Sequence, residues 1–311
     1  MFITPVMSKI KQIRTCQGLP EARELSAEPF MIKNAASFLG WPDTYKELAH
    51  LSMYEGSKDM VSIGGYGESE FMSATDALRM VSSSESTGAY IAGWEYAVGD
   101  LATAIESRIG TGIPLWEDHC LIRRLARGLS GAPAAALTMI SELMKWLFIG
   151  KPGTSSLPHV DPLGSNGWMY VFSGRKRWRI AISKSGAPGQ YCVCNGDPSP
   201  QPCMHCFEPS NEALREFDFY EGIVEAGDLI FVPGGAFHAV ENLPGPTPVI
   251  AVTHNFSLDK ALLKAEVDRA MSLGNLADLS DNLEVDSLLS GLVLTLTRYP
   301  EALHAFLNLV A

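Results

Sequence analysis

Two histidines and one aspartate stand at spacings that could bind a single metal ion. His159 and Asp161 are two residues apart in LPHVDPLG, and side chains at positions i and i+2 of a strand point to the same face. His238 follows a Gly-Gly turn in LIFVPGGAFH, which would aim its side chain back from an apolar strand. Two imidazoles and one carboxylate form the ligand set of non-haem Fe(II) sites, with positions left open. The alternative is a solvated turn and a hydrogen-bonded loop histidine, so the surrounding residues must decide.

Lys176 supports the metal interpretation. It lies in SGRKRWRI, where strand alternation places Lys176, Trp178 and Ile180 on one face and the three arginines on the other. Trp178 and Ile180 favour the buried face, and a buried ammonium costs free energy unless it pairs with an anion. The distal carboxylate of 2-oxoglutarate is such an anion. We predict that Lys176 binds it; the alternative is that Lys176 is exposed and one of the arginines binds it.

Four cysteines lie in a Gly- and Pro-rich insertion, residues 183–220. Cys192, Cys194, Cys203 and Cys206 form C-x-C and C-x-x-C pairs that could hold a structural Zn²⁺. The first pair is closer than zinc spacing usually is. The alternative is a substrate-shaping loop whose thiols are free or form a disulfide. In either case we expect the insertion to border the site and to contribute to specificity.

The elements that must position these residues are mainly strands. From residue 157 to 256, short apolar segments rich in β-branched and aromatic residues alternate with Gly, Pro and Ser turns, which is typical of a β-barrel or sandwich. Residues 134–149 and the segments after 257 have helical spacing. A Ser/Thr cap before DALRMV and the short segment PFMIKN predict a helix and a strand nearer the N-terminus.

Composition narrows the class of protein. The chain has 311 residues, 46% hydrophobic and 19% charged, which excludes a disordered tail, a collagen and a coiled coil. A net charge of −11 argues against general nucleic-acid binding. We find no signal peptide and no membrane-spanning segment, so we expect a cytoplasmic or nuclear protein without membrane partners.

The run HVDPLGSNGWMYVFSGRKRW, with EAGDLIFVPGGAFHAVENL and AVTHNFS, resembles the Jumonji-C (JmjC) family of Fe(II)- and 2-oxoglutarate-dependent oxygenases, nearest to its hydroxylase branch. The resemblance covers roughly residues 25–257. It implies an all-β core with flanking helices: a double-stranded β-helix, or cupin-like jelly-roll barrel, with helical N-terminal and C-terminal additions. The expected domain is 1–256, including the insertion, and 257–311 would be a helical cap or a homodimer contact.

The resemblance also implies roles for single residues. His159, Asp161 and His238 match the metal ligands and so the catalytic centre, and Lys176 matches the residue that pairs with the co-substrate carboxylate. Further co-substrate positions match Tyr90, Ser156 and Asn255, with Thr154 able to replace Ser156. Met169 departs from the family pattern, because close relatives carry Asn there.

The implied activity is a dioxygenase reaction that uses Fe(II), 2-oxoglutarate and O₂. A C–H bond of a protein side chain would be hydroxylated, and an N-methyl group would be lost after hydroxylation. Two alternatives stay open: the same chemistry on a small molecule or free amino acid, and a JmjC-like binding module without turnover. A cupin isomerase fits less well, since such cupins usually present His-x-His and need no carboxylate-binding lysine.

Overall fold

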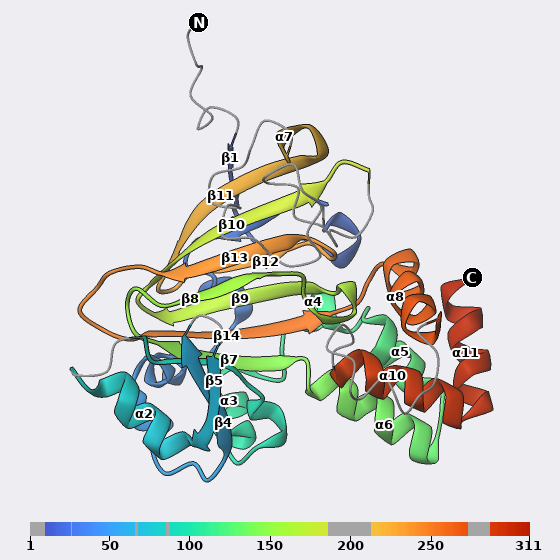
Figure 1. The fold of residues 1–311 in the computed structure, drawn as a ribbon, viewed down its shortest axis with the longest axis horizontal. Coiled ribbons are helices and arrows are strands. Elements are labelled where there is room, and N and C mark those ends of the chain that lie inside the picture. Colours follow the sequence, from blue (N-terminus) through green and yellow to red (C-terminus); the bar gives the residue numbers. More distant parts are fainter. Residues whose placement is uncertain (1–9, 26, 66–67, 85–87, 186–212, 273–286) are drawn as a thin grey trace, which may run out of the picture.

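The strands form two sheets that face each other. The computed structural model describes residues 10–25, 27–65, 68–84, 88–185, 213–272 and 287–311. In this part of the chain the smaller sheet has the order β1 (Lys11–Gln12), β11 (Phe217–Glu225), β10 (Arg175–Ser183), β13 (Phe237–Asn242) and β8 (Ser155–His159). The larger sheet has the order β2 (Arg14–Cys16), β3 (Phe30–Ile32), β12 (Leu229–Val232), β9 (Asn166–Ser173), β14 (Val249–Phe256), β7 (Lys145–Gly150), β6 (Tyr90–Trp94), β4 (Met60–Gly65) and β5 (Glu68–Ser73). Figure 1 shows β11, β10 and β13 beside β9, β14 and β7.

Nearly all the strand pairs are antiparallel, with β1–β11 and β2–β3 as the parallel ones. An apolar cluster lies between the sheets, with Trp178 and Val240 from the smaller one and Val171 and Ala251 from the larger one. Two sheets whose strands alternate apolar and polar residues form such a layer of interdigitated side chains when their apolar faces meet. The sequence prediction of a β-rich core is confirmed at this level.

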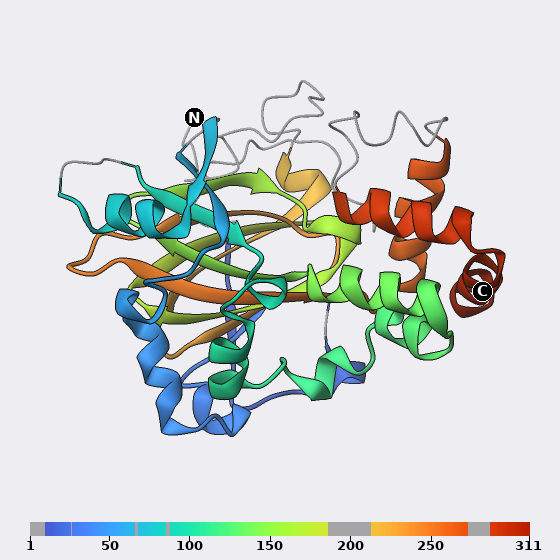
Figure 2. The ribbon, with the colours of Figure 1, turned by 90° about the horizontal axis from the view of Figure 1, so that it is seen from below.

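Helices cover the outer face of the larger sheet and one of its ends. They are α1 (Ala36–Leu39), α2 (Ala74–Ser82), α3 (Ala102–Ile109), α4 (Pro114–Glu117), α5 (Leu121–Arg127), α6 (Gly131–Glu142), α8 (Lys260–Ser272), α10 (Ser287–Arg298) and α11 (Pro300–Val310). The short helix α7 (Ala213–Glu216) instead packs on β11 of the smaller sheet. Short 3-10 turns complete them: η2 (Ala22–Glu24), η3 (Asp43–Ala49), η4 (Leu51–Met53), η5 (Tyr96–Val98) and η6 (Pro162–Gly164). The C-terminal helices stand next to α5 and α6 in both Figure 1 and Figure 2.

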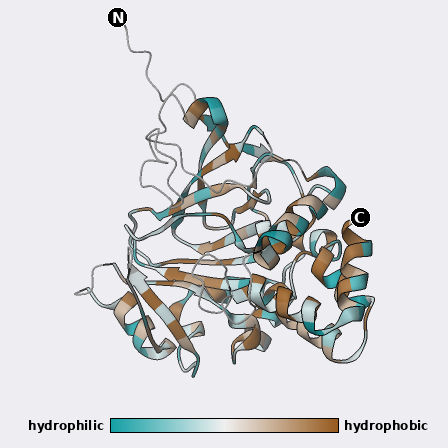
Figure 3. Ribbon diagram, turned by 45° about the vertical axis from the view of Figure 1, so that its right-hand side comes forward, coloured by the Kyte–Doolittle hydropathy of each residue, from teal (hydrophilic) through white to brown (hydrophobic). Residues whose placement is uncertain are grey.

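The second apolar cluster joins these helices to the sheet. Leu289 and Leu296 of α10 and Leu263 of α8 belong to the same buried cluster as Trp168 and Phe231 of the larger sheet. Figure 3 shows hydrophobic residues along the central strands and on the C-terminal helices. The protein therefore has three layers: the smaller sheet, the larger sheet and the helices. Apolar side chains fill the space between neighbouring layers.

One predicted element is wrong in part. Residues 134–149 do not form a single helix, because α6 ends at Glu142 and β7 begins at Lys145. The segment KWLFIG contains two aromatic residues and one β-branched residue, and it pairs with β14 from His254 to Val249. Tertiary pairing in the sheet has overridden the helical continuation.

Candidate metal centre and its pocket

A bulge in the edge strand β8 aligns two of the three candidate ligands. His238 of β13 pairs with His159, and two residues later Val240 pairs with Ser156, so β8 carries one extra residue between these pairs. Pro158 lies in the extra stretch, and a proline without an N–H group is tolerated at an edge strand or a bulge. The extra residue re-aims β8 so that Ser156 and His159 both line the pocket.

Asp161 reaches the site by a different route from the one predicted. The strand ends at His159, so alternation along a strand does not place Asp161; instead Asp161 precedes η6 with extended backbone, φ −63° and ψ 147°. Pro162 favours this extended conformation in the residue before it. The Asp161 side chain makes no capping hydrogen bond to η6. Its carboxylate is directed to the two histidines.

The two loops that carry ligands are packed against each other. In the turn before His238, a Cβ atom on Gly234 would lie 2.6 Å from the carbonyl oxygen of Gly164 in η6. Only glycine allows this approach. The Gly-Gly turn thus holds His238 close to the Asp161 loop.

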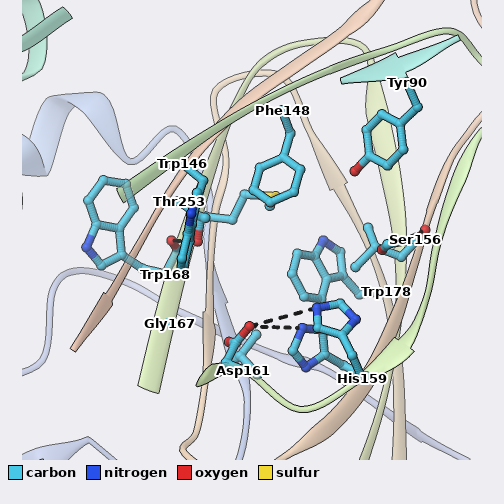
Figure 4. Close-up of a pocket in the computed structure, with 14 residues that line it drawn as sticks. Tyr90, Trp146, Phe148, Ser156, His159, Asp161, Gly167, Trp168, Trp178 and Thr253 are labelled. Atoms are coloured by element: carbon cyan, nitrogen blue, oxygen red, sulfur yellow. Dashed lines mark hydrogen bonds and ion pairs between the residues drawn. The ribbon is translucent and has the colours of Figure 1, made fainter. Parts of the chain in front are cut away.

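The ligand atoms converge. Asp161 Oδ1 lies 3.9 Å from His159 Nε2 and 3.7 Å from His238 Nε2, and one atom of each residue lies within 4.8 Å of the others. Two atoms that each bond one ion at about 2.0–2.2 Å can be no more than about 4.4 Å apart, which both aspartate distances satisfy. Figure 4 shows Asp161 directed to the imidazoles. The three residues fit a metal ion.

His238 is held ready to donate its lone pair. Its Nδ1 lies 3.1 Å from the carbonyl oxygen of Ala236, so Nδ1–H donates there and Nε2 faces Asp161. Burial lowers the pKa of His238 to about 4, although Asp161 opposes this shift. The indole of Trp178 stacks on the imidazole at 5.4 Å between ring centroids. His238 is therefore neutral at pH 7 and fixed in orientation.

The candidate ligands lie at one end of a pocket of about 450 Å³, part of which is open to solvent. Five aromatic side chains contribute to its walls, and Figure 4 shows them around the candidate ligands. The wall residues are Tyr90, Trp146, Phe148, Ser156, Gly167, Trp168, Met169, Trp178, Val232, Val240 and Thr253. Apolar walls with a few polar groups are typical of a small-ligand site.

Lys176 is buried on the inner face of β10, as alternation predicted, with 1% of its surface exposed. Its ammonium lies 5.4 Å from the ring centroid of Tyr90 and 5.6 Å from that of Phe148, directly behind the pocket wall. It makes no ion pair within the described residues. Burial lowers the pKa of Lys176 to about 7. An anion at this end of the pocket would offset that cost.

Of the other residues predicted to bind the co-substrate, some line the pocket and some do not. Tyr90 and Ser156 line the pocket, and burial raises the pKa of Tyr90. Thr154 lies outside the lining, with its hydroxyl bonded to the Lys151 carbonyl oxygen at 2.7 Å and to Asn242 at 2.7 Å. Asn255 donates to Ser165 at 3.1 Å.

Asn255 and Asp161 both lie against the backbone of Gly167. A Cβ atom there would meet Asn255 Oδ1 at 3.0 Å and Asp161 Oδ2 at 3.1 Å. Asn255 is therefore adjacent to the metal ligands and not to the lysine end of the pocket.

Sequence reasoning missed Thr253, which faces the pocket and donates to the Trp168 carbonyl oxygen at 2.6 Å. Alternation could have found it, because Thr253 shares a strand face with Asn255. It also missed Glu117, a buried carboxylate behind the pocket wall. Glu117 accepts hydrogen bonds from Trp168 Nε1 at 3.0 Å and from the Ile113 N–H at 2.9 Å.

Glu117 also contacts two charged or titratable groups. It lies 3.1 Å from His254 Nδ1 and 3.0 Å from an Arg123 nitrogen. Burial would raise the pKa of Glu117, but His254 and Arg123 lower it to about 2. Burial lowers the pKa of His254, whose Nε2 is hydrogen-bonded to the Tyr96 hydroxyl. The prediction that His254 points away from Asn255 and is structural agrees with this position.

The predicted zinc cluster of Cys192, Cys194, Cys203 and Cys206 lies outside the described residues, and no observation supports zinc there. The structure does describe the end of β10, the strand that leads into this insertion. Ser183, at the end of β10, lies three residues beyond Ile180, which pairs with His238. The insertion therefore leaves the sheet at the end that carries the metal ligands.

Three proteins of Arabidopsis thaliana share part of this sequence. The chain is 29% identical over 123 residues to the arginine-specific demethylase JMJ22, which is 38% of this chain and 24% of that protein. It is 28% identical over 118 residues to the lysine-specific demethylase JMJ21, 36% of this chain and 12% of that protein. The third, the arginine-specific demethylase JMJ20, is 28% identical over 152 residues, 45% of this chain and 31% of that protein.

The chain is a distant relative of the JmjC demethylases. This confirms the resemblance to the JmjC family predicted from its motifs. The chain spans less than a third of the length of each of these relatives. No family model matches it. A separate observation concerns membranes: among the helices that the structure describes, none combines the length and apolar character of a transmembrane span.

Proposed function

We propose that this protein is an Fe(II)- and 2-oxoglutarate-dependent oxygenase that hydroxylates, or demethylates through hydroxylation, a side chain of a protein substrate. One observation carries the proposal: a His-Asp-His cluster of ligand atoms lines a pocket, and behind the Tyr90 and Phe148 wall of that pocket lies a buried lysine with no anionic partner among the described residues. The two sheets fit the double-stranded β-helix that the JmjC relationship implies.

His159, Asp161 and His238 would hold the metal. Bound iron with 2-oxoglutarate supplies the oxidation of a substrate C–H bond by O₂. The chain's own contribution is to present two imidazoles and one carboxylate. The Nδ1–H bond to Ala236 keeps the Nε2 lone pair of His238 available without a proton to lose.

Lys176 would bind the distal carboxylate of the co-substrate, with the hydroxyls of Tyr90 and Ser156 as hydrogen-bond donors. An anion beside the ammonium favours its charged form, so binding would raise the lysine pKa from about 7. The aromatic walls lower the polarity around the bound co-substrate, which would strengthen its electrostatic contacts inside the pocket. Asn255, next to Gly167 and Asp161, would help to fix the metal-bound end.

A protein substrate is favoured by the relatives, which are named as arginine- and lysine-specific demethylases. The experiment is succinate formation from 2-oxoglutarate by the purified chain with Fe(II), ascorbate and O₂. Peptides that contain Arg, Lys and their N-methyl forms would be tested beside free amino acids.

We expect peptide-stimulated succinate, with a mass gain of one oxygen or the loss of a methyl group in the peptide. An Asp161→Ala variant serves as the control for iron in solution. Stimulation by free amino acids alone would indicate a small-molecule hydroxylase, and no succinate under any condition would contradict the oxygenase proposal.

A further inference from the structure

A buried carboxamide lies at the lysine end of the pocket and has no role in the function proposed above. Asn242 is the last residue of β13, is 1% exposed, and pairs across the strands with Lys176 of β10. Directly opposed residues of neighbouring strands point to the same face, with Cβ atoms about 4.5–5.5 Å apart. Both side chains therefore point into the interior from adjacent positions of the sheet.

The orientation of this amide follows from its neighbour Thr154. The Thr154 hydroxyl has one proton, and it donates that proton to the Lys151 carbonyl oxygen at 2.7 Å. Towards Asn242 it can only accept, so the amide group 2.7 Å from it is Nδ2. Asn242 Oδ1 consequently faces the other way. It is buried and accepts no hydrogen bond within the described residues.

Tyr90 is a common neighbour of the amide and the ammonium. A Cβ atom on Gly150 would lie 2.5 Å from Asn242 Nδ2 and 2.5 Å from the Tyr90 ring, so both groups pack on the same glycine. The Lys176 ammonium lies 5.4 Å from the centroid of that ring. A buried acceptor and a buried cation, neither with a hydrogen-bond partner in the part of the chain that the structure describes, thus lie near one tyrosine.

Leaving either group unsatisfied costs free energy. We propose that Asn242 is a positioning residue for the co-substrate: its Oδ1, which accepts no hydrogen bond from the described residues in this structure, accepts one from the Lys176 ammonium when that side chain turns towards it, and so directs the remaining ammonium protons towards the carboxylate. The inference rests on the proposed binding of 2-oxoglutarate. A carbonyl oxygen cannot donate to a carboxylate, so Asn242 acts through Lys176 and touches neither substrate nor metal.

The consequence is selectivity for a keto acid with a second carboxylate. 2-Oxobutyrate carries the keto acid group but lacks the distal carboxylate, so it should not depend on Asn242. Both ligands would be titrated calorimetrically into the protein loaded with Mn²⁺, which binds such sites without O₂ chemistry.

In Asn242→Leu, a variant of similar size, we expect 2-oxoglutarate affinity to fall roughly 10- to 100-fold, the effect of one hydrogen bond to a charged group. Binding of 2-oxobutyrate and of Mn²⁺ should be unchanged. Asn308→Leu, the same substitution at an exposed position of α11, is the matched control and should bind both keto acids as the wild type does. Equal weakening of both keto acids, or unchanged 2-oxoglutarate affinity, would overturn the inference.

A second measurement needs no ligand. In protein labelled with ¹³Cε-lysine, the Lys176 signal is assigned by its loss in Lys176→Met, and its pKa is read by titration. We expect a lower Lys176 pKa in Asn242→Leu and a higher one in Asn242→Asp, where a carboxylate faces the ammonium. The Asp variant should also bind 2-oxoglutarate more weakly, because its own anion competes.

These experiments distinguish a failure of the proposed oxygenase function from a failure of the proposed role of Asn242. If the wild type binds no 2-oxoglutarate, the proposed function fails, and the lysine titration still decides whether Asn242 contacts Lys176. If the wild type binds 2-oxoglutarate and the Lys176 pKa is the same in all three proteins, the Asn242 inference fails alone.

Discussion

His159 and His238 carry the same ring but lie in different surroundings. The His159 side chain is 42% exposed, whereas that of His238 is 4% exposed and stacks on Trp178. His159 can therefore be replaced with little loss of packing, which makes it the better position for testing the metal site without unfolding the protein.

We expect Mn²⁺ to raise the melting temperature of the wild type and to leave His159→Ala unchanged. An ion that binds only the folded protein stabilises it by about 2.7 kcal/mol at a hundredfold excess over its Kd. The measurement is thermal unfolding with and without the metal, followed by chelation with EDTA. His304→Ala, an exposed histidine of α11, is the control and should respond like the wild type. Equal stabilisation of His159→Ala would place the metal elsewhere.

Lys176 makes the free energy of unfolding depend on pH. Burial lowers its pKa to about 7 in the folded protein, whereas lysine in an unfolded chain titrates near 10.4. Between these values only the unfolded chain holds the proton, so stability rises with pH across this window. Without co-substrate, the wild type should therefore gain stability relative to Lys176→Met between about pH 7 and pH 10.

Urea unfolding at three pH values checks this. Lys260→Met, which removes an exposed lysine, should show the same pH profile as the wild type. Parallel profiles for Lys176→Met and the wild type would mean that the ammonium is already paired in the folded protein.

At the scale of secondary-structure elements, one carboxylate is hydrogen-bonded to both β9 and β14 on the side away from the pocket. Glu117, at the end of α4, accepts from Trp168 of β9 and from His254 of β14. The residues on the other face of β14 are Thr253 and Asn255, next to the pocket and the Asp161 loop. The buried network thus sets how these two strands present their inner faces.

Removing this carboxylate should be costly. Glu117→Ala takes the nearest carboxylate from the Arg123 guanidinium and leaves the Trp168 N–H without its acceptor, and breaking a buried pair typically costs about 3–5 kcal/mol. Its neighbour Asp118 pairs with Arg127, and both side chains are more than half exposed. Asp118→Ala should cost about 0–1 kcal/mol. Denaturant unfolding of the two variants checks the difference, and similar losses would contradict it.

The sequence predicted the strands better than their junctions. Alternation identified the buried face of β10, because the pleat alone places Lys176 beside Trp178. The bulge in β8, the extended Asp161 before Pro162 and the break between α6 and β7 depend on pairing with distant strands, so local pattern could not show them. Asn242 and Glu117 were missed for the same reason: their partners lie far away in the sequence.

At the scale of the whole molecule, the C-terminal helices share their core with the larger sheet. Leu263 of α8, Leu292 of α10 and Phe306 of α11 belong to the cluster that contains Trp168. We propose that residues 257–311 are an integral cap and do not form a separable domain. The cap would remain necessary whether or not a second copy docks on it.

A chain truncated after Ser257 should therefore fail to fold. It would expose the sheet-facing part of this cluster, and exposing even a few fully buried Leu or Phe side chains costs about 1.5–3 kcal/mol each, against a total stability of only about 5–15 kcal/mol. Circular dichroism and gel filtration of the truncated chain, with the full chain as reference, test this. A monodisperse, cooperatively unfolding fragment would support the boundary at 256 as a true domain limit.

The stack of Trp178 on His238 gives the candidate metal centre an optical reporter. The indole lies 5.4 Å from the imidazole that would bind the ion, and Trp168 and Trp146 line the same pocket. A paramagnetic ion such as Fe(II) or Ni²⁺ at this distance opens a non-radiative path for the excited indole. The fluorescence of three of the six tryptophans would therefore be weaker in the metal-loaded protein than in the metal-free protein. Occupancy of the site could then be followed in the intact protein without a label.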